Sequence, residues 1–429
     1  MRHDRYLPSV RRLLHLAPLL VSLLLGCGRQ DNSVVIEFWT LQLSPTFNDY
    51  FHRLVASYER QHPGVRIRWV DIPYDAAVQK LLSSAVAGNA PDVVNLSADF
   101  LAKFNGMHAC IDLTPAVARC GYTFLPNALD ICTCNGTLAG IPWYLNTYVL
   151  IFNTRLIRAA GFTERTLPRT YAELIPFVRQ YKDRTGKYAL FWNIGKDSYL
   201  PMMLGSEGIP MTDSALTHAT FNTERGVALV DQWVQSYREG YLPRESVIKP
   251  GSAVVEAYQS GQVAMLMTGP VFLKRIRTNA PAIYAETDVA PAIVGATGMH
   301  ELAAMSISVL STSAHPKEAA DFALYVTNPE NQLAFSRMTT TLPSVVEALR
   351  DPFFTTEVGS VETRARVLSA RQLPFATRLQ SHLLDADFDV LRDAFDEAIQ
   401  KACFGELSTR EALAQAARTW DGVLRKNRR

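Results

Sequence analysis

VVIEFWT (residues 34–40), VRIRWV (65–70) and DVVNL (92–96) are three short runs that have the length and the apolar content of β-strands. The segments between them, 45–60 and 76–87, place apolar residues at i, i+3 and i+4 spacings, which is typical of amphipathic helices. The alternation of strand, helix, strand, helix and strand predicts an α/β sheet whose strands are mainly parallel.

Ligands of open α/β sheets bind beyond the carboxyl ends of the strands, so residues 39–44 and 95–99 are expected at a binding edge. Aromatic and amide side chains gather at this and later predicted strand ends: Trp39 with Gln42, Trp143 and Tyr144 with Asn146, and Trp192 with Asn193. An aromatic ring covers the C–H face of a sugar, and amide or carboxylate groups bond its hydroxyls. The alternative is that each Trp belongs to the core.

The rest of the chain alternates less regularly between strand and helix patterns. Strands are expected at 141–144, 148–153, 263–267 and 302–310, and helices at 171–182, 225–239, 253–259, 315–325, 388–404 and 409–424. No internal repeat or long linker interrupts this part of the sequence.

The N-terminus has the layout of a bacterial export signal. A basic head (Arg2, Arg5, Arg11 and Arg12) precedes an apolar run at 13–25, which is too short to span a bilayer, and Gly26 and Cys27 follow. We expect cleavage of residues 1–26 and lipid on Cys27, with 27–33 as a linker. The protein would then be exported and held on the membrane, facing the periplasm or the cell exterior. An ordinary signal peptide or an uncleaved anchor is the alternative.

Composition narrows the function classes. About 400 residues after the signal suffice for two domains, and a formal net charge of +2 gives no reason to expect nucleic acid as a partner.

Cys110, Cys120, Cys132 and Cys134 lie close in sequence, and export permits disulfides among them, with the pairing left open. A metal site there is the weaker alternative because the spacing is Cys-x-Cys. Cys403 is expected as a buried free thiol.

The sequence offers no recognisable catalytic motif. His300–Glu301 lacks the second histidine of a zinc helix, residues 205–208 are not a Gly-x-Ser-x-Gly elbow, and neither a Walker loop nor a dinucleotide fingerprint is present. We therefore expect a binding protein without a cofactor or metal, rather than an enzyme.

Six stretches carry a family resemblance when they are taken in order with the N-terminal signal: IEFWTLQL (36–43), GNAPDVVNLSAD (88–99), NGTLAGIPWY (135–144), LIFN (150–153), MTGP (267–270) and HPKEAADFALYVTNPEN (315–331). The chain resembles, over residues 33–429, the extracellular solute-binding proteins of family 1, the maltose-binding-protein-like group. Within that group it is similar to the carbohydrate-binding lipoproteins of bacterial ABC importers.

The resemblance implies a two-lobed, periplasmic-binding-protein-like α/β fold of type II, with a hinge of several crossovers. Transferred to this sequence, the crossovers fall near Asn146–Leu150, Met265–Gly269 and Ser308–Thr312. The N-terminal lobe would then contain 33–146 and 268–309, and the C-terminal lobe 147–267 and 310–429.

The resemblance also implies roles for residues of the cleft between the lobes. The loop at 39–44 offers polar side chains to a sugar, Asp99 holds the acidic position after the third strand, and Asn146 holds the polar position of the first crossover. Gly269 and Pro270 match a segment that usually continues with a stacking Trp, which here is replaced by Val271. The expected ligand-binding residues are Trp39, Gln42, Ser44, Asn95, Asp99, Trp143, Tyr144, Asn146, Trp192, Asn193, Gly269 and Pro270.

Such a receptor captures a sugar or oligosaccharide between its lobes and delivers it to two permease subunits driven by a cytoplasmic ATPase, and we expect it to be a monomer. A receptor for a glycerophosphodiester or peptide, a surface carbohydrate-active enzyme, and a sensor subunit or adhesin are the alternatives. Trp143→Ala is expected to weaken binding without unfolding the protein.

Overall fold

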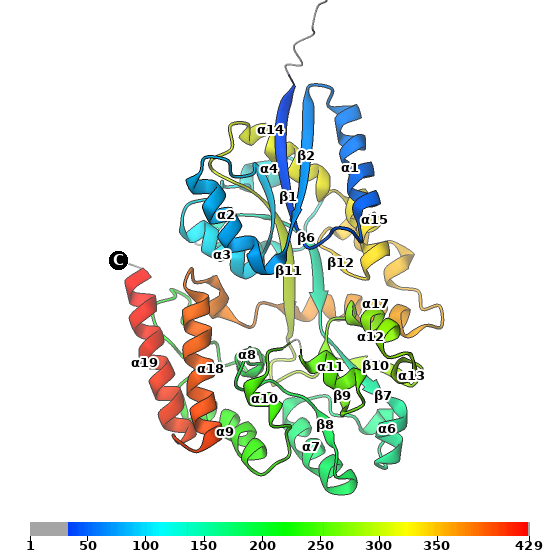
Figure 1. The fold of residues 1–429 in the computed structure, drawn as a ribbon, viewed down its shortest axis with the longest axis vertical. Helices are drawn as coiled ribbons and strands as arrows, with labels where there is room; N and C mark the ends of the chain where they lie inside the picture. The colour runs from blue at the N-terminus through cyan, green and yellow to red at the C-terminus, as the bar shows by residue number, and fades with distance from the viewer. Residues whose placement is uncertain (1–32, 135, 252, 428–429) are drawn as a thin grey trace, which may run out of the picture.

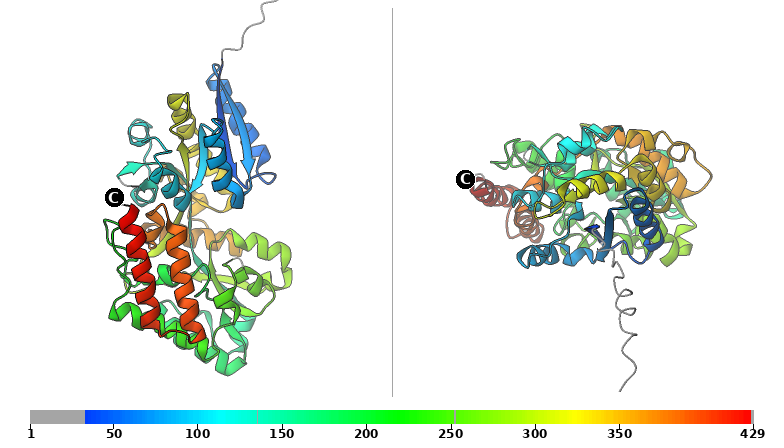
Figure 2. Two further views of the ribbon diagram at one scale, coloured as in Figure 1. Left: turned by 60° about the vertical axis from the view of Figure 1, so that its left-hand side comes forward. Right: turned by 90° about the horizontal axis from the view of Figure 1, so that it is seen from above.

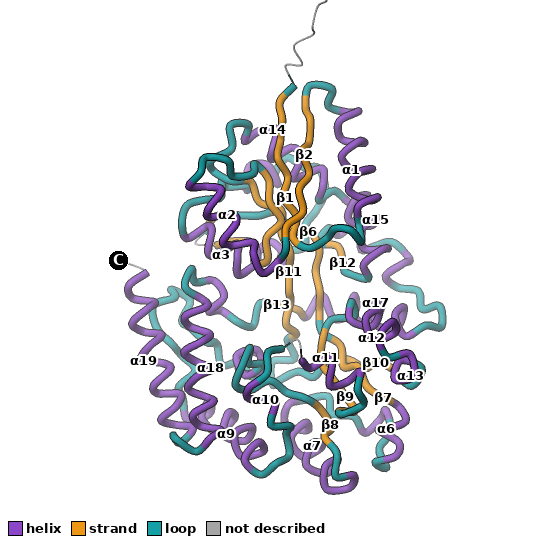
Figure 3. Tube along the Cα trace, viewed as in Figure 1, coloured by secondary structure: helices purple, strands orange, loops and turns teal. Residues whose placement is uncertain are grey.

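The computed structural model describes residues 33–134, 136–251 and 253–427. The chain forms two α/β lobes, one above the other in Figure 1, each built around its own sheet. Extended segments connect the lobes near the centre of the molecule, where β6 (Ile141–Thr147) and β11 (His300–Val309) reach down toward the lower lobe (Figure 3). The predicted two-lobed fold class is confirmed. The expected signal peptide, linker and lipidated Cys27 lie outside the described residues, apart from residue 33.

The first lobe contains one mixed sheet in the order β12-β6-β11-β3-β1-β2, with β13 beside β11. β1 is parallel to both β2 and β3, as predicted, whereas β11 is antiparallel to β3 and β6. Besides β6 and β11, the elements of this lobe are β1 (Val34–Leu41), α1 (Asn48–Gln61), β2 (Val65–Ile72), α2 (Ala77–Val86), β3 (Val93–Ser97), α3 (Ala98–Gly106), α4 (Thr114–Val117), α5 (Pro126–Cys132), β4 (Thr133–Cys134), β5 (Thr137–Leu138), α14 (Pro316–Val326), α15 (Pro329–Thr339), β12 (Leu342–Pro343) and α16 (Val346–Leu349).

The second lobe contains a four-stranded sheet in the order β10-β7-β9-β8. Helices α18 and α19 form an antiparallel pair along one side of it (Figure 2). Its elements are β7 (Val149–Asn153), α6 (Thr154–Ala159), α7 (Tyr171–Thr185), β8 (Tyr188–Leu190), α8 (Leu200–Ser206), α9 (Glu224–Arg238), α10 (Glu245–Ile248), α11 (Ala253–Gln259), β9 (Val263–Thr268), α12 (Phe272–Asn279), α13 (Pro281–Tyr284), β10 (Thr287–Pro291), α17 (Val361–Gln372), α18 (Phe388–Phe404) and α19 (Thr409–Asn427). Strand β13 (Ala376–Thr377), between α17 and α18 in the chain, pairs with the start of β11.

The carboxyl ends of strands in both sheets face the boundary between the lobes. Met305 of β11 lies opposite Ser97 at the end of β3, so β3 ends near the middle of β11, which enters from the second lobe. In the other sheet, Thr268 at the end of β9 lies opposite Val149, directly after the first crossover. Because β8 is parallel to β9, it ends at the same edge. The two edges where α/β sheets bind ligands therefore face each other.

Two of the three crossovers lie at other positions in the chain than expected. After β9 the chain stays in the second lobe, because β10 pairs with β7, so the second crossover lies between β10 and β11 rather than near Met265–Gly269. After β11 it stays in the first lobe, because Phe322 of α14 packs edge-on against Phe38 of β1 at 5.2 Å between ring centroids. The third crossover therefore follows α16 instead of lying near Ser308–Thr312.

The cysteines are free thiols in the described part of the chain. Cys132 ends α5 and only Cys134 lies in β4, so the two do not share a strand. Cys403 is buried in α18, as expected. No helix within the described residues is long and apolar enough to cross a membrane.

Candidate ligand-binding cleft

The loop after β1 is fixed by one carboxylate at the end of β2. Asp71 accepts hydrogen bonds from the Thr40 hydroxyl (2.6 Å) and from the backbone N–H groups of Leu43 and Ser44 (both 3.0 Å). Gln42 adopts a left-handed backbone conformation, with φ 55°, and is exposed. This loop thereby presents polar side chains at the carboxyl edge of the first sheet.

A hollow of about 720 Å³ lies at this edge. Its lining residues come from the ends of β1 and β2 and from the start of α1: Gln42, Ser44, Asn48, His52, Trp69, Asp71, Pro73 and Tyr74. Two of the predicted ligand-binding residues, Gln42 and Ser44, are thus brought together.

A second hollow, the inter-lobe groove, is bordered by both lobes and has a volume of about 610 Å³. Tyr144 and Asn146 of β6 line it from the first lobe, and the middle and C-terminal part of α12 lines it from the second. The full lining is Leu43, Thr46, Phe47, Tyr144, Asn146, Val271, Lys274, Arg275, Thr278, Asn279, Phe335, Met338, Thr339, Thr340 and Thr341. Aromatic rings, hydroxyls and amides predominate, which is a lining suited to a polyhydroxylated ligand.

Tyr144 supplies an aromatic face and a neutral hydroxyl to the inter-lobe groove. Its ring packs against Trp143 and Phe335, with centroid distances of 4.9 and 5.3 Å. Burial raises the pKa of Tyr144, and the nearby Tyr74 raises it further, so the phenol keeps its proton at neutral pH. A neutral phenol both donates and accepts hydrogen bonds, as a sugar hydroxyl does.

Gly269 and Asn146, two residues that the resemblance assigns to the cleft, lie close together in the structure. A Cβ atom at Gly269 would lie 4.0 Å from Asn146 Oδ1. Pro270 is buried, and Val271 is 41% exposed and lines the groove. An aliphatic residue therefore lies where the family's stacking Trp was expected.

The three tryptophans predicted for the site are core residues, which corrects that prediction. Trp143 is 0% exposed and stacks on Phe335 at 4.7 Å, and Trp192 is 0% exposed and stacks on Trp233 at 5.3 Å. Trp39 is 5% exposed and donates a 2.6 Å hydrogen bond from Nε1 to Glu37. Trp39 and Trp143 lie within β1 and β6, and Trp192 follows β8; all three rings turn inward because the cores need large apolar side chains.

Three polar residues of the prediction have partners within the protein. Asn95 is fully buried and its Nδ2 donates to the Ser306 carbonyl at 3.2 Å, which ties β3 to β11 and corrects its assignment to the ligand. Asp99 is half-buried in the first turn of α3 and accepts a hydrogen bond from Ser97. Asn193 is buried and its Nδ2 donates to the Lys196 carbonyl at 2.9 Å.

Residues 53–361 match the family of bacterial extracellular solute-binding proteins, well over half of the chain. The chain belongs to this family. The family predicted from the sequence motifs is therefore confirmed, and the facing strand edges are those of a solute-binding protein.

This solute-binding protein is similar to several known proteins. A protein of Synechococcus sp. MITs9220, provisionally named an oligosaccharide periplasmic-binding protein and solved in complex with zinc, is 32% identical with a TM-score of 0.82, covering 91% of this chain and 99% of that chain. The galactooligosaccharide-binding protein of Bacillus subtilis is 22% identical over 384 residues, 86% of each chain. A lipoprotein of Streptomyces antibioticus, described as uncharacterized and encoded in the oleD 5′ region, is 26% identical over 356 residues, 80% of this chain and 78% of that one.

The solute-binding protein also has cleft residues that the sequence prediction missed. Tyr74 follows β2 directly, so the strand-end rule applied to that strand would have found it. Helix α12 and residues Thr339–Thr341 carry no comparable signal, because only the tertiary fold brings them to the groove. Among the described residues, no cluster of three or more His, Cys, Asp or Glu side chains could hold a metal ion.

Proposed function

We propose that this protein is the substrate-binding lipoprotein of a bacterial ABC importer and that it captures a sugar or oligosaccharide between its lobes. The observation that carries the proposal is the inter-lobe groove, where Tyr144 and Asn146 of one lobe face α12 of the other. The family supports a binding role rather than an enzymatic one. The names of the Synechococcus and Bacillus relatives support an oligosaccharide as the ligand.

Capture follows from the contacts that a ligand in the groove makes with both lobes. A sugar bonded to Tyr144 and Asn146 on one side and to α12 on the other stabilises the arrangement in which the lobes are close, and so shifts the population toward it. The crossovers absorb the hinge rotation. The closed form docks on two permease subunits that a cytoplasmic ATPase drives.

A lipid on Cys27 would hold the receptor at the membrane and raise its effective concentration at the permease. Export is supported by the extracellular solute-binding family, and the lipid by the similar Streptomyces lipoprotein. The receptor is proposed to act as a monomer without a cofactor.

One observation favours a second candidate ligand, an anionic solute such as a glycerophosphodiester. Lys274 and Arg275 line the inter-lobe groove, and Arg and Lys side chains are the usual phosphate partners. Arg275 lies 3.4 Å from Glu256, which neutralises part of this charge and leaves the sugar as the better-supported ligand.

A thermal-shift screen of the soluble protein starting at Gly28 tests the proposal. The panel contains maltotriose, β-1,4-galactotriose, other mono- to oligosaccharides, and glycerophosphodiesters. A ligand that binds only the folded state raises the melting temperature with the logarithm of its concentration. We expect the rise with a saccharide. A rise only with phosphodiesters would replace sugar by the anionic solute, and no rise with either class would contradict both.

A further inference from the structure

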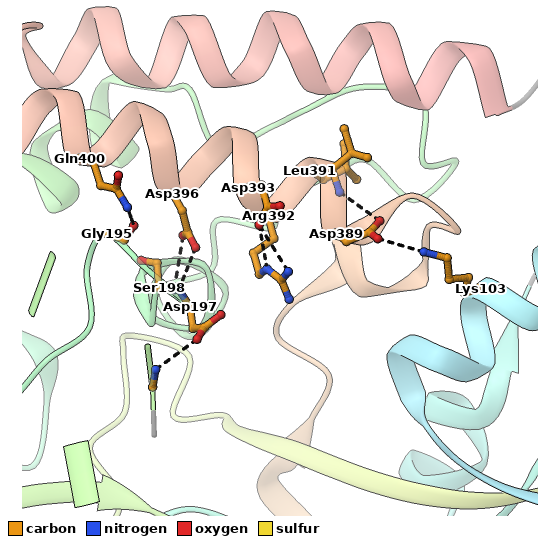
Figure 4. A network of polar contacts seen from close by, with 12 residues as sticks. Lys103, Gly195, Asp197, Ser198, Asp389, Leu391, Arg392, Asp393, Asp396 and Gln400 are labelled. Carbon is orange, nitrogen blue, oxygen red and sulfur yellow. Dashed lines mark hydrogen bonds and ion pairs between the residues drawn. The ribbon is translucent and has the colours of Figure 1, made fainter. Parts of the chain in front are cut away.

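The loop after β8, residues 193–198, is held in place by helix α18 from the far end of the sequence (Figure 4). Because β8 ends at the edge that faces the first lobe, this loop lies on the second lobe's side of the cleft. Figure 4 shows the side chains of Asp396 and Gln400 pointing from α18 toward the loop. We call residues 193–198 the β8 loop.

Asp396 accepts two backbone hydrogen bonds from the β8 loop. The N–H of Asp197 donates to Asp396 Oδ2 at 2.8 Å, and the N–H of Ser198 donates to Oδ1 at 3.4 Å. One turn later on α18, the Gln400 side chain donates to the Gly195 carbonyl. Asp396 is only 4% exposed, so water is largely excluded as a substitute acceptor for these N–H groups.

The loop conformation that these bonds fix is an unusual one. Asp197 has a φ of 47°, in the left-handed region that a non-glycine residue adopts only when its surroundings impose it. Its side chain turns toward residue 251, where Oδ2 accepts a hydrogen bond from the Gly251 N–H at 3.1 Å. Asp197 is half-buried, so its carboxylate keeps acceptor capacity at the surface of the lobe.

Asn193, at the start of the β8 loop, carries an unpartnered polar atom. Asn193 is 0% exposed and its Oδ1 has no hydrogen-bond partner among the described residues. Gly251 packs against both side chains, since a Cβ atom there would lie 3.6 Å from Asn193 Nδ2 and 3.8 Å from Asp197 Cβ. The glycine thus leaves room for the Asp197 side chain, whose carboxylate is an acceptor of the kind that bonds sugar hydroxyls.

We propose that Asp396 is a positioning residue of the ligand site, which holds the β8 loop so that Asp197 bonds hydroxyl groups of the ligand. This inference rests on the proposed function, because it assigns the second lobe's share of the same cleft. In this role Asp396 does not contact the ligand itself. It acts through the hydrogen bonds that it accepts from the N–H groups of Asp197 and Ser198.

The electrostatics of the site agree with this role. Burial, and to a lesser extent the nearby Asp197, raises the pKa of Asp396 to about 7, although the two N–H bonds and Arg392 act in the opposite direction. A buried carboxyl is costly to ionise, and an apolar residue of similar size would fill the same space in a helix interior. The two backbone N–H groups of the β8 loop, which need an acceptor, explain why a carboxyl group occupies this position.

The test compares Asp396→Ala and Asp396→Asn with Asp393→Asn, which removes an exposed carboxylate from the same helix without touching the loop. Titration calorimetry with maltotriose and β-1,4-galactotriose measures the dissociation constant. Hydrogen exchange measures the amides of Asp197 and Ser198. We expect Asp396→Ala to raise the dissociation constant about tenfold or more and to accelerate exchange at both amides. Asp396→Asn, which keeps one acceptor oxygen, should show a smaller effect, and Asp393→Asn none.

The two readouts separate the possible failures. An unchanged dissociation constant in folded Asp396→Ala would overturn the proposal, even if the melting temperature falls, because a purely structural role lowers stability alone. If Asp396→Ala does not fold, the same comparison is made with Asp396→Asn. If the wild-type protein binds no saccharide of the thermal-shift panel, the proposed function fails. Faster exchange in the variants would then still support positioning of the loop, and unchanged exchange would overturn that as well.

Discussion

Trp143→Ala is expected to destabilise the protein rather than to impair its ligand site. The indole is fully buried between Phe335, on which it stacks, and the edge of Phe51. A buried Trp removes up to about 250 Å² from water, worth about 6 kcal/mol at 25 cal/mol per Å². Its Nε1 has no hydrogen-bond partner among the described residues, which costs about 1–3 kcal/mol. The expected loss of unfolding free energy is therefore about 3–5 kcal/mol, as for other buried Trp→Ala changes.

Urea unfolding measures this loss as a lower midpoint at unchanged slope. Trp143→Phe is the matched control, because it keeps an aromatic ring against Phe335 and removes the unpartnered N–H. We expect it to cost less than about 1.5 kcal/mol. Saccharide affinity of the folded Trp143→Ala protein should change by less than about twofold, since the ring does not reach the groove. A loss below about 1 kcal/mol together with abolished binding would refute this reasoning and return Trp143 to the ligand site.

Three further predictions follow from the same contacts. Tyr144→Ala should weaken saccharide binding at least about tenfold in calorimetry, while Tyr144→Phe, which keeps the ring, should retain part of the affinity; equal affinity in all three proteins would remove this side chain from the site. Burial raises the pKa of Glu301 from 4.5 to about 8, so the folded state holds the proton and wild-type stability falls as pH rises from about 4.5 to about 8. Glu301→Gln should therefore gain stability relative to wild type between pH 5 and pH 8.5, on the order of 3–5 kcal/mol in urea unfolding, and a difference independent of pH would contradict this. Lys103→Met should cost less than about 1 kcal/mol, because its 2.9 Å ion pair with Asp389 across the lobes (Figure 4) is partly exposed; a loss above about 2 kcal/mol would show that the pair matters more than its exposure suggests.

The fold was largely predictable because many of its helices and strands have strong local patterns. The helices predicted at 253–259 and 388–404 have those bounds in the structure. Helix α17 was not predicted, because its charged residues are spread around the helix and one of them is buried. Arg366 is 6% exposed, donates to the Phe353 carbonyl at 2.6 Å and lies over that ring, so tertiary contacts replace an apolar stripe.

The candidate site was predictable as a set of loops but not as a set of side chains. The strand-end rule selected Gln42, Ser44, Tyr144 and Asn146, and in the structure the first two line the hollow beside β1 and the last two line the inter-lobe groove. It could not tell which aromatic residues turn inward, since that depends on volumes that distant helices fill. Asp396 could not be predicted at all, because it lies about 200 residues from the loop that it bonds, on a helix whose pattern indicates only burial.

The central claim is that a saccharide binds in the inter-lobe groove and contacts both lobes. A crystal structure of the protein with the saccharide that gives the largest thermal shift tests this claim most directly. We predict a single saccharide in hydrogen-bond contact with Tyr144 or Asn146 on one side and with α12 or the β8 loop on the other. A saccharide bound outside the groove, or held by one lobe alone, would contradict the account.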